Sequence, residues 1–243
     1  MSIDDPAGYP ILKLMKTVFT PSMFVAIAHL SYPVRKFKDC RIFPVVVDSL
    51  PSNLTRGKDY TYGHTFNEAM AVVREVNNLN LSIPLAVSFS YKGIYYVPQS
   101  YAIPTDSSYY EYFMPCTDHP PPYYADPKEY CGGYVFYARS TVEGFASNSV
   151  EKRAITFVTD QIVKKLACVA KQSNFDLNFV LAAYDVDFDS LGTCTELGFF
   201  PLDGTYPLTR LTKTLSKKLL AKFGFTLPDD KFFWRCRFSV FKV

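Results

Sequence analysis

The N-terminal part of the chain alternates between apolar runs and a helical pattern. Residues 23–30 are apolar almost throughout, as in a buried strand, and 42–47 form a second apolar run. A capping box, Thr65 with Glu68, opens a helix whose apolar face consists of Phe66, Met70, Val73 and Val76. Alternation of large and small residues over 85–91 then predicts a strand. A helix that leads into a strand is half of a β/α repeat, so the pattern favours a parallel sheet.

The middle of the chain, 93–145, breaks this pattern. It is rich in Tyr and Pro, has no helical period and contains short alternating pieces such as Gly133–Ala138. These features predict an inserted, β-rich subdomain. Its tyrosines could line a groove that binds sugar rings, but we favour a role in the core of a small subdomain, because aromatic side chains bury much area.

The last third of the chain returns to helices and strands. Asn148 and Glu151 have the spacing of a helix cap and predict a long helix that continues to Leu166. An apolar strand over 179–184 follows, and leucine spacing predicts another helix that Gly224 ends. Alternation over 231–242 predicts a final strand.

Composition and charge exclude several classes of protein. Hydrophobic residues make up 48% of the 243 positions, which excludes a disordered chain. The apolar runs are far shorter than the ~20 residues that cross a bilayer. The net charge is +3, spread over the whole length, whereas a nucleic-acid-binding protein shows a concentrated basic stripe. We therefore expect neither a membrane nor a nucleic acid as a partner.

The cysteines and two sequons favour an oxidising compartment. None of the six cysteines lies in a CxxC pair, so no zinc or redox motif is present, and their even number favours disulfides over the alternative of six buried thiols. Asn53 and Asn80 begin Asn-x-Ser/Thr sequons and are candidate glycosylation sites. Acidic residues and Pro6 stand where a signal peptide would be apolar. We expect a secreted protein, of which this chain is the mature form or a fragment.

Several pieces of the chain resemble the family 18 glycoside hydrolases, which comprise chitinases and chitinase-like lectins. The strongest match is the apolar run 179–183 that leads into Tyr184, Asp185, Asp187 and Asp189, followed by Cys194 and a Tyr-Pro-Leu helix start at 206–208. It resembles the last barrel strand of that family. Residues 85–93 are similar to the seventh strand, 24–32 to the sixth, and Tyr109–Glu111 with Cys116 to the start of the insertion domain. The resemblance covers roughly residues 20–220 in the same order.

This resemblance implies an α/β fold, the C-terminal half of a (β/α)8 TIM barrel with an inserted α+β subdomain. The implied division of the chain is a barrel part at 1–92, the insertion at 93–145, a second barrel part at 146–224 and a strand-like extension at 225–243. The resemblance also implies a disulfide between Cys116 and Cys194. Carbohydrate contacts would come from Tyr32, Tyr91, Tyr184 and Asp185.

Departures from the family pattern imply that hydrolysis has been lost. The family's Asp-x-x-Asp-x-Asp-x-Glu signature, whose Glu is the proton donor, is absent from the sequence. Pro33 stands where the sixth strand carries an Asp, and proline supplies neither an acid nor an amide donor. Ala182 or Ala183 stands where the family has a Trp beneath a sugar ring. The implied function is an inactive extracellular chitinase-like protein with affinity for chitin or N-acetylglucosamine oligosaccharides, without catalytic residues, metal or cofactor.

Other interpretations remain open from the sequence. The chain could be a fragment or split half of an active chitinase, or a protein-interaction module on a degenerate barrel. A rival alignment makes Asp189 a shortened proton donor, although the following Cys194 fits the last strand better. A metal site at Asp185, Asp187 and Asp189 is less favoured than hydrogen-bonded carboxylates, because no calcium loop follows. We expect the three histidines at 29, 64 and 119 to be structural or on the surface.

Overall fold

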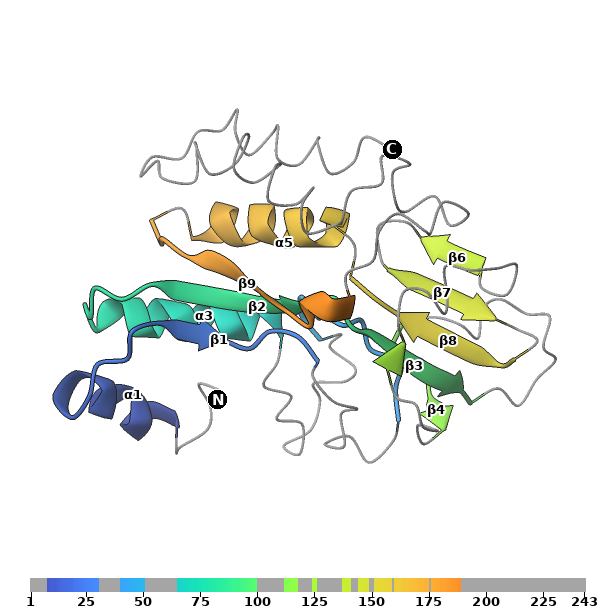
Figure 1. The fold of residues 1–243 in the computed structure, drawn as a ribbon, viewed down its shortest axis with the longest axis horizontal. Helices are drawn as coiled ribbons and strands as arrows, with labels where there is room; N and C mark the ends of the chain where they lie inside the picture. The colour runs from blue at the N-terminus through green and yellow to red at the C-terminus, as the bar shows by residue number, and fades with distance from the viewer. Residues whose placement is uncertain are drawn as a thin grey trace.

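The computed structural model describes residues 8–30, 40–50, 65–99, 112–117, 124–125, 137–140, 144–148, 151–158, 160–174 and 176–188. Two β-sheets lie end to end in this part of the chain, and Figure 1 shows helices packed beside the first of them. The helix and strand expected over 208–224 and 231–242 lie outside the described residues. No helix in the described part is both long and apolar enough to cross a bilayer.

The first sheet is parallel and has the strand order β1-β2-β9. Strand β1 (Phe24–Ala26) pairs with β2 (Leu85–Ser90), which pairs in turn with β9 (Val180–Tyr184). All six residues of the central strand β2 are buried. Three parallel strands joined through helices form part of a (β/α)8 barrel rather than a closed one, in agreement with the expected fold.

Helix α3 (Phe66–Asn78) begins at the capping box that the sequence indicates. The Thr65 hydroxyl accepts a hydrogen bond from the Glu68 amide at 3.2 Å, while the Glu68 carboxylate accepts from the Thr65 amide at 3.1 Å. Its expected apolar face, which includes Met70 and Val73, is buried against β1 and β2. The prediction of this helix is therefore confirmed. A second helix, α1 (Gly8–Thr17), precedes β1 and was not expected from the sequence.

The second sheet is antiparallel and is inserted between β2 and β9. It starts with β3 (Gly93–Pro98), only two residues after β2, and has the order β4-β3-β8-β7-β6 with β5 also paired to β3. The remaining strands are β4 (Cys116–Thr117), β5 (Tyr124–Ala125), β6 (Tyr137–Ser140), β7 (Phe145–Asn148) and β8 (Arg153–Thr156). The β-rich insertion is present, and its sheet continues to Thr156; the boundary at 145 stays a prediction.

The prediction of a helix that starts at Asn148 is wrong for its first part, which forms strands instead. The Asn148 side chain does accept a hydrogen bond from the Glu151 amide at 3.1 Å, but it does so in the turn between β7 and β8. Lys152 has a φ of 53°, in the left-handed region, which stops a helix from continuing there. The helix α5 (Asp160–Ser173) begins only after this hairpin. The capping pattern was real, and strand pairing across the sheet overrode it.

The disulfide expected between Cys116 and Cys194 is also wrong. Cys116 is bonded to Cys40 instead, with 4.9 Å between their Cα atoms and a separation of 76 positions in sequence. The reason is that the segment around Cys40 runs beside the start of β4, where the Cys116 amide donates to the Cys40 carbonyl at 2.9 Å. Cys168 on α5 is disulfide-bonded as well. Cys194 lies outside the described residues.

Candidate functional site

The carboxyl ends of β1, β2 and β9 bring a cluster of polar side chains together. Parallel strands end at one edge of their sheet, and loops after that edge carry the active sites of barrel enzymes. In Figure 1 these ends point toward the antiparallel sheet. We name this group the strand-end cluster; it consists of His29, Ser88, Ser90, Lys92, Tyr184 and Asp185.

Asp185 is held by two members of the strand-end cluster. Its Oδ2 accepts a hydrogen bond from the Ser90 hydroxyl at 2.5 Å, and its Oδ1 lies 3.1 Å from the Lys92 ammonium. Burial raises the pKa of Asp185, but the hydrogen bonds from Ser90 and Lys92 and the charge of Lys92 outweigh it, so this pKa lies below its ordinary value. The carboxylate is therefore held in its ionised form.

Lys92 joins the two sheets. Its ammonium lies 4.3 Å from the centre of the Tyr124 ring on β5 and 5.0 Å from the centre of the Phe188 ring after β9. Its backbone amide donates to the Ser90 hydroxyl at 3.0 Å. A cation between two aromatic faces and a carboxylate is well satisfied, so Lys92 fixes the insertion against the end of β9.

His29 occupies the buried side of the cluster. Its Nδ1 lies 2.7 Å from the Ser88 hydroxyl oxygen, which itself accepts a hydrogen bond from the Ala28 amide at 2.9 Å. The imidazole is also 4.9 Å from the Tyr184 ring, between centroids. His29 is 2% exposed, in agreement with the structural role expected for it, and its ring packs at a tilt against that of Tyr184.

The structure brings together some of the residues expected to contact carbohydrate. Tyr184 and Asp185 lie side by side, and the Tyr184 side of the cluster is open, with that residue 39% exposed. Tyr91 lies at the same strand end, but its ring is buried and meets Phe89 edge-on at 5.3 Å between centroids. A buried ring offers no face to a sugar, so the accessible pair is Tyr184 and Asp185. Sugar contact stays a prediction.

The remaining candidate residues lie partly inside and partly outside the described residues. Asn80 is exposed just after α3 and is sterically open to glycosylation, which stays a prediction. Tyr32, Asn53 and Asp189 lie outside the described residues. No group of three or more potential metal-binding side chains gathers in the described part of the chain, and Asp185 is already paired with Lys92.

Sequence reasoning placed Ser90 and Lys92 at a strand end but gave neither of them, nor Ser88, a role in the site. The signal was present: the two serines are polar positions within a strand that is otherwise apolar, and both point to the same face because strand side chains alternate. Buried polar residues in such a strand need hydrogen-bond partners, which here are His29 and Asp185.

Comparison of the sequence with protein-family models and with curated proteins gives no match. Solved structures do match the fold. The Group IV chitinase of Ostrinia furnacalis has a TM-score of 0.53 and 14% identity over 83% of this chain and 51% of its own. The same enzyme in complex with allosamidin gives a TM-score of 0.53 at 15% identity, covering 84% of this chain and 51% of that one.

A second chitinase of that insect supports the same fold. Catalytic domain 2 of its Group II chitinase has a TM-score of 0.51 and 13% identity, over 87% of this chain and 51% of that one. The chain thus spans about half the length of these structures, in agreement with three parallel strands and an inserted antiparallel sheet. The chain has the fold of the family 18 chitinases, over the part that comprises the last barrel strands and the insertion.

Proposed function

We propose that the chain is a chitinase-like protein that binds N-acetylglucosamine oligosaccharides without hydrolysing them, with Tyr184 and Asp185 as the contact residues. The observation that carries the proposal is the geometry at the end of β9. The Asp185 carboxylate is held by the Ser90 hydroxyl and the Lys92 ammonium, next to the exposed ring of Tyr184. An ionised carboxylate beside an exposed tyrosine ring is suited to accept hydrogen bonds from sugar hydroxyl and amide groups.

An extracellular location is part of this proposal. The Cys40–Cys116 disulfide and the bonded state of Cys168 support it, because disulfides persist in oxidising compartments. The exposed sequon at Asn80 is compatible with such a location.

Binding is tested by calorimetric titration of the protein with N-acetylglucosamine tetramer. We expect saturable binding that Tyr184→Ala and Asp185→Asn each weaken by about tenfold, the loss that a charge-assisted hydrogen bond or a stacked ring represents. Asp187→Asn is the matched control, because Asp187 is an exposed carboxylate only two positions away. Absence of saturable binding, or equal loss in all three variants, would contradict the proposal.

Hydrolysis is tested separately with chito-oligosaccharides and chromatographic detection of products. We expect no product, because the proton donor is missing and Pro33 stands at the position of the sixth-strand acid. Steady turnover that Asp189→Asn abolishes would refute this expectation and support the rival alignment of the Asp-rich segment.

A second candidate function rests on the open sheet. Within the described residues, β1 and β9 are the edge strands of the parallel sheet. Large apolar side chains on α1 and between α1 and β1 are also exposed, namely those of Ile11, Leu14, Val18, Phe19 and Met23. In a complete barrel such an edge pairs with further strands, so we propose as the alternative that a complementary half-barrel covers it and forms an active glycosidase.

The alternatives are separable by experiment. Retention on chitin beads, with release by soluble oligomers, favours sugar binding by the chain alone, whereas a pure protein-interaction module would not be retained. Activity that appears only on mixing with the N-terminal half of a family 18 enzyme would favour the half-barrel alternative. Val18→Asp, at a position that is 72% exposed, should then block the restored activity.

A further inference from the structure

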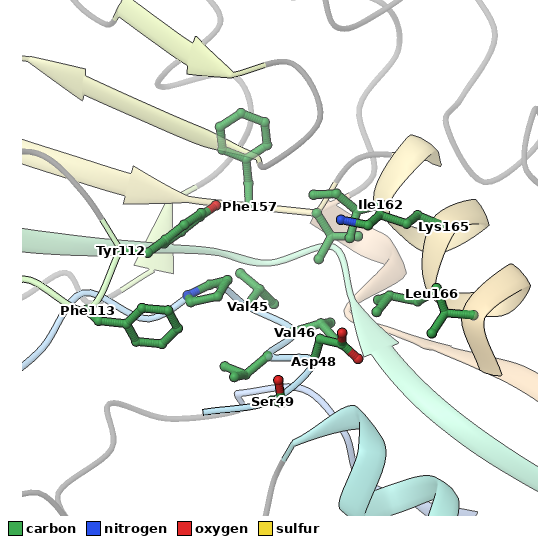
Figure 2. A pocket seen from close by; sticks show the side chains of 14 residues that line it. Val45, Val46, Asp48, Ser49, Tyr112, Phe113, Phe157, Ile162, Lys165 and Leu166 are labelled. Carbon is green, nitrogen blue, oxygen red and sulfur yellow. The ribbon is translucent and has the colours of Figure 1, made fainter. Parts of the chain in front are cut away.

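A cavity of about 300 Å³ lies away from the strand-end cluster. It is lined by the segment 44–49, by Tyr112 and Phe113, and by α5, as Figure 2 shows, and it opens to solvent on one side. None of the six residues of the strand-end cluster lines it. The cavity is therefore a second concave site with its own walls.

The walls of the cavity are mainly apolar. Val45 and Phe157 are buried and line opposite sides, and Leu166 and Ile162 of α5 close a third side. Small-molecule sites typically have volumes of roughly 300–1,000 Å³ and mostly apolar linings. A volume of this size holds roughly ten water-sized groups at about 30 Å³ each, which corresponds to a chain of about eight to ten carbon atoms.

Few polar side chains reach the cavity, and they differ in character. Lys165 extends from α5, and Figure 2 shows its amine directed toward the space between Ile162 and Phe157. No ion pair between described residues engages Lys165. Asp48 lies on the other side, and its carbonyl accepts a hydrogen bond from the Asn67 amide in the first turn of α3, at 3.3 Å. Lys165 carries the one positive charge among the described residues that line the cavity.

We propose that this cavity binds a medium-chain amphipathic carboxylate, with its hydrocarbon chain among the apolar walls and its carboxylate on Lys165. The apolar lining removes the hydrocarbon chain from water, which favours binding. The ammonium supplies one charge-assisted hydrogen bond that fixes the orientation of the ligand. This activity is independent of oligosaccharide binding, because the two sites share no residue.

The proposal is tested by calorimetric titration of the full chain with decanoate below its micelle concentration. We expect one saturable site. Lys165→Met should weaken the binding of decanoate about tenfold, because a hydrogen bond to a charged group is lost. The same substitution should leave the binding of decan-1-ol unchanged. Val169→Phe, which places a ring in the cavity from α5, should abolish binding of both compounds while the melting temperature stays within a few degrees of the parent protein.

Three outcomes would overturn the proposal. They are the absence of saturable decanoate binding, equal decanoate affinity in Lys165→Met and the parent protein, and decanoate binding by a folded Val169→Phe variant. The charge assignment has its own control in decylamine with Asp48→Asn. If decylamine binds more tightly than decanoate and Asp48→Asn abolishes that binding, the ligand is a cation and the proposal of a carboxylate is wrong.

Discussion

Replacing Cys40 and Cys116 together by alanine should strongly destabilise the protein. The bond closes a loop of 76 positions, and the chain-entropy model assigns such a cross-link about 4.5 kcal/mol at 25 °C, because it restricts the unfolded chain. Single domains are stable by only about 5–15 kcal/mol, so a loss of this size removes a large part of the total. The double variant also avoids leaving a free thiol, which either single substitution would create.

The assay is urea unfolding followed by far-UV circular dichroism under non-reducing conditions, with the parent protein in parallel. A lower midpoint is expected, and a larger m-value as well, since the unlinked chain exposes more surface on unfolding. A second variant pair, Cys40→Ser with Cys116→Ser, separates the loss of the bond from the choice of replacement. A loss below about 1 kcal/mol, or a peptide map that pairs Cys116 with Cys194, would refute the reasoning from loop closure.

Three further predictions concern local features. Thr65→Ala removes the cap of α3 and should cost about 1 kcal/mol in the free energy of unfolding, measured by urea titration; an unchanged midpoint would contradict the role of the cap. Gly144→Ala should cost at least about 2 kcal/mol, because φ is +62° and an added Cβ would lie 1.9 Å from the Phe157 carbonyl oxygen; a variant as stable as the parent in thermal unfolding would show that the turn can shift. Lys92→Met should raise the pKa of Asp185 toward its ordinary value, measured by NMR titration of the carboxyl carbon. Since that pKa is lowered on folding, Asp185 stabilises the fold above its unfolded pKa of about 3.9, and this contribution is lost as the pH falls through the folded value. The free energy of unfolding of the variant should therefore fall less between neutral and acidic pH than that of the parent protein. An equal fall in both proteins would argue against the ion pair.

Local patterns predicted the elements whose stability is decided locally. The capping box at Thr65 and the alternation over 85–91 each correspond to an element in the structure, because hydrogen bonds and burial within a few residues determine them. The cap at Asn148 shows the limit of this reasoning. Its hydrogen bond forms, but pairing of β7 with β8 decides whether a helix or a hairpin follows.

Contacts between distant segments could not be predicted in the same way. Cys40 lies next to Cys116 only because the chain returns past the start of β4, and no spacing in the sequence indicates this. Tyr184 and Asp185 were identified from a resemblance at one strand end, whereas their partners lie on other strands, in Ser90 of β2 and His29 after β1. Register across the parallel sheet, with Ser90 opposite Tyr184, creates the strand-end cluster.

The short connection between β2 and β3 limits how far the two sheets can move apart. Only Tyr91 and Lys92 separate the strands, and both are held, since the Tyr91 amide donates to the Tyr184 carbonyl at 3.2 Å and the Lys92 amide donates to Ser90. A hinge needs residues whose backbone dihedrals are able to change, and these two would first have to break hydrogen bonds. These hydrogen bonds hold the two sheets in place at this connection, so the proposed oligosaccharide binding should lose little ordering entropy and move the backbone little.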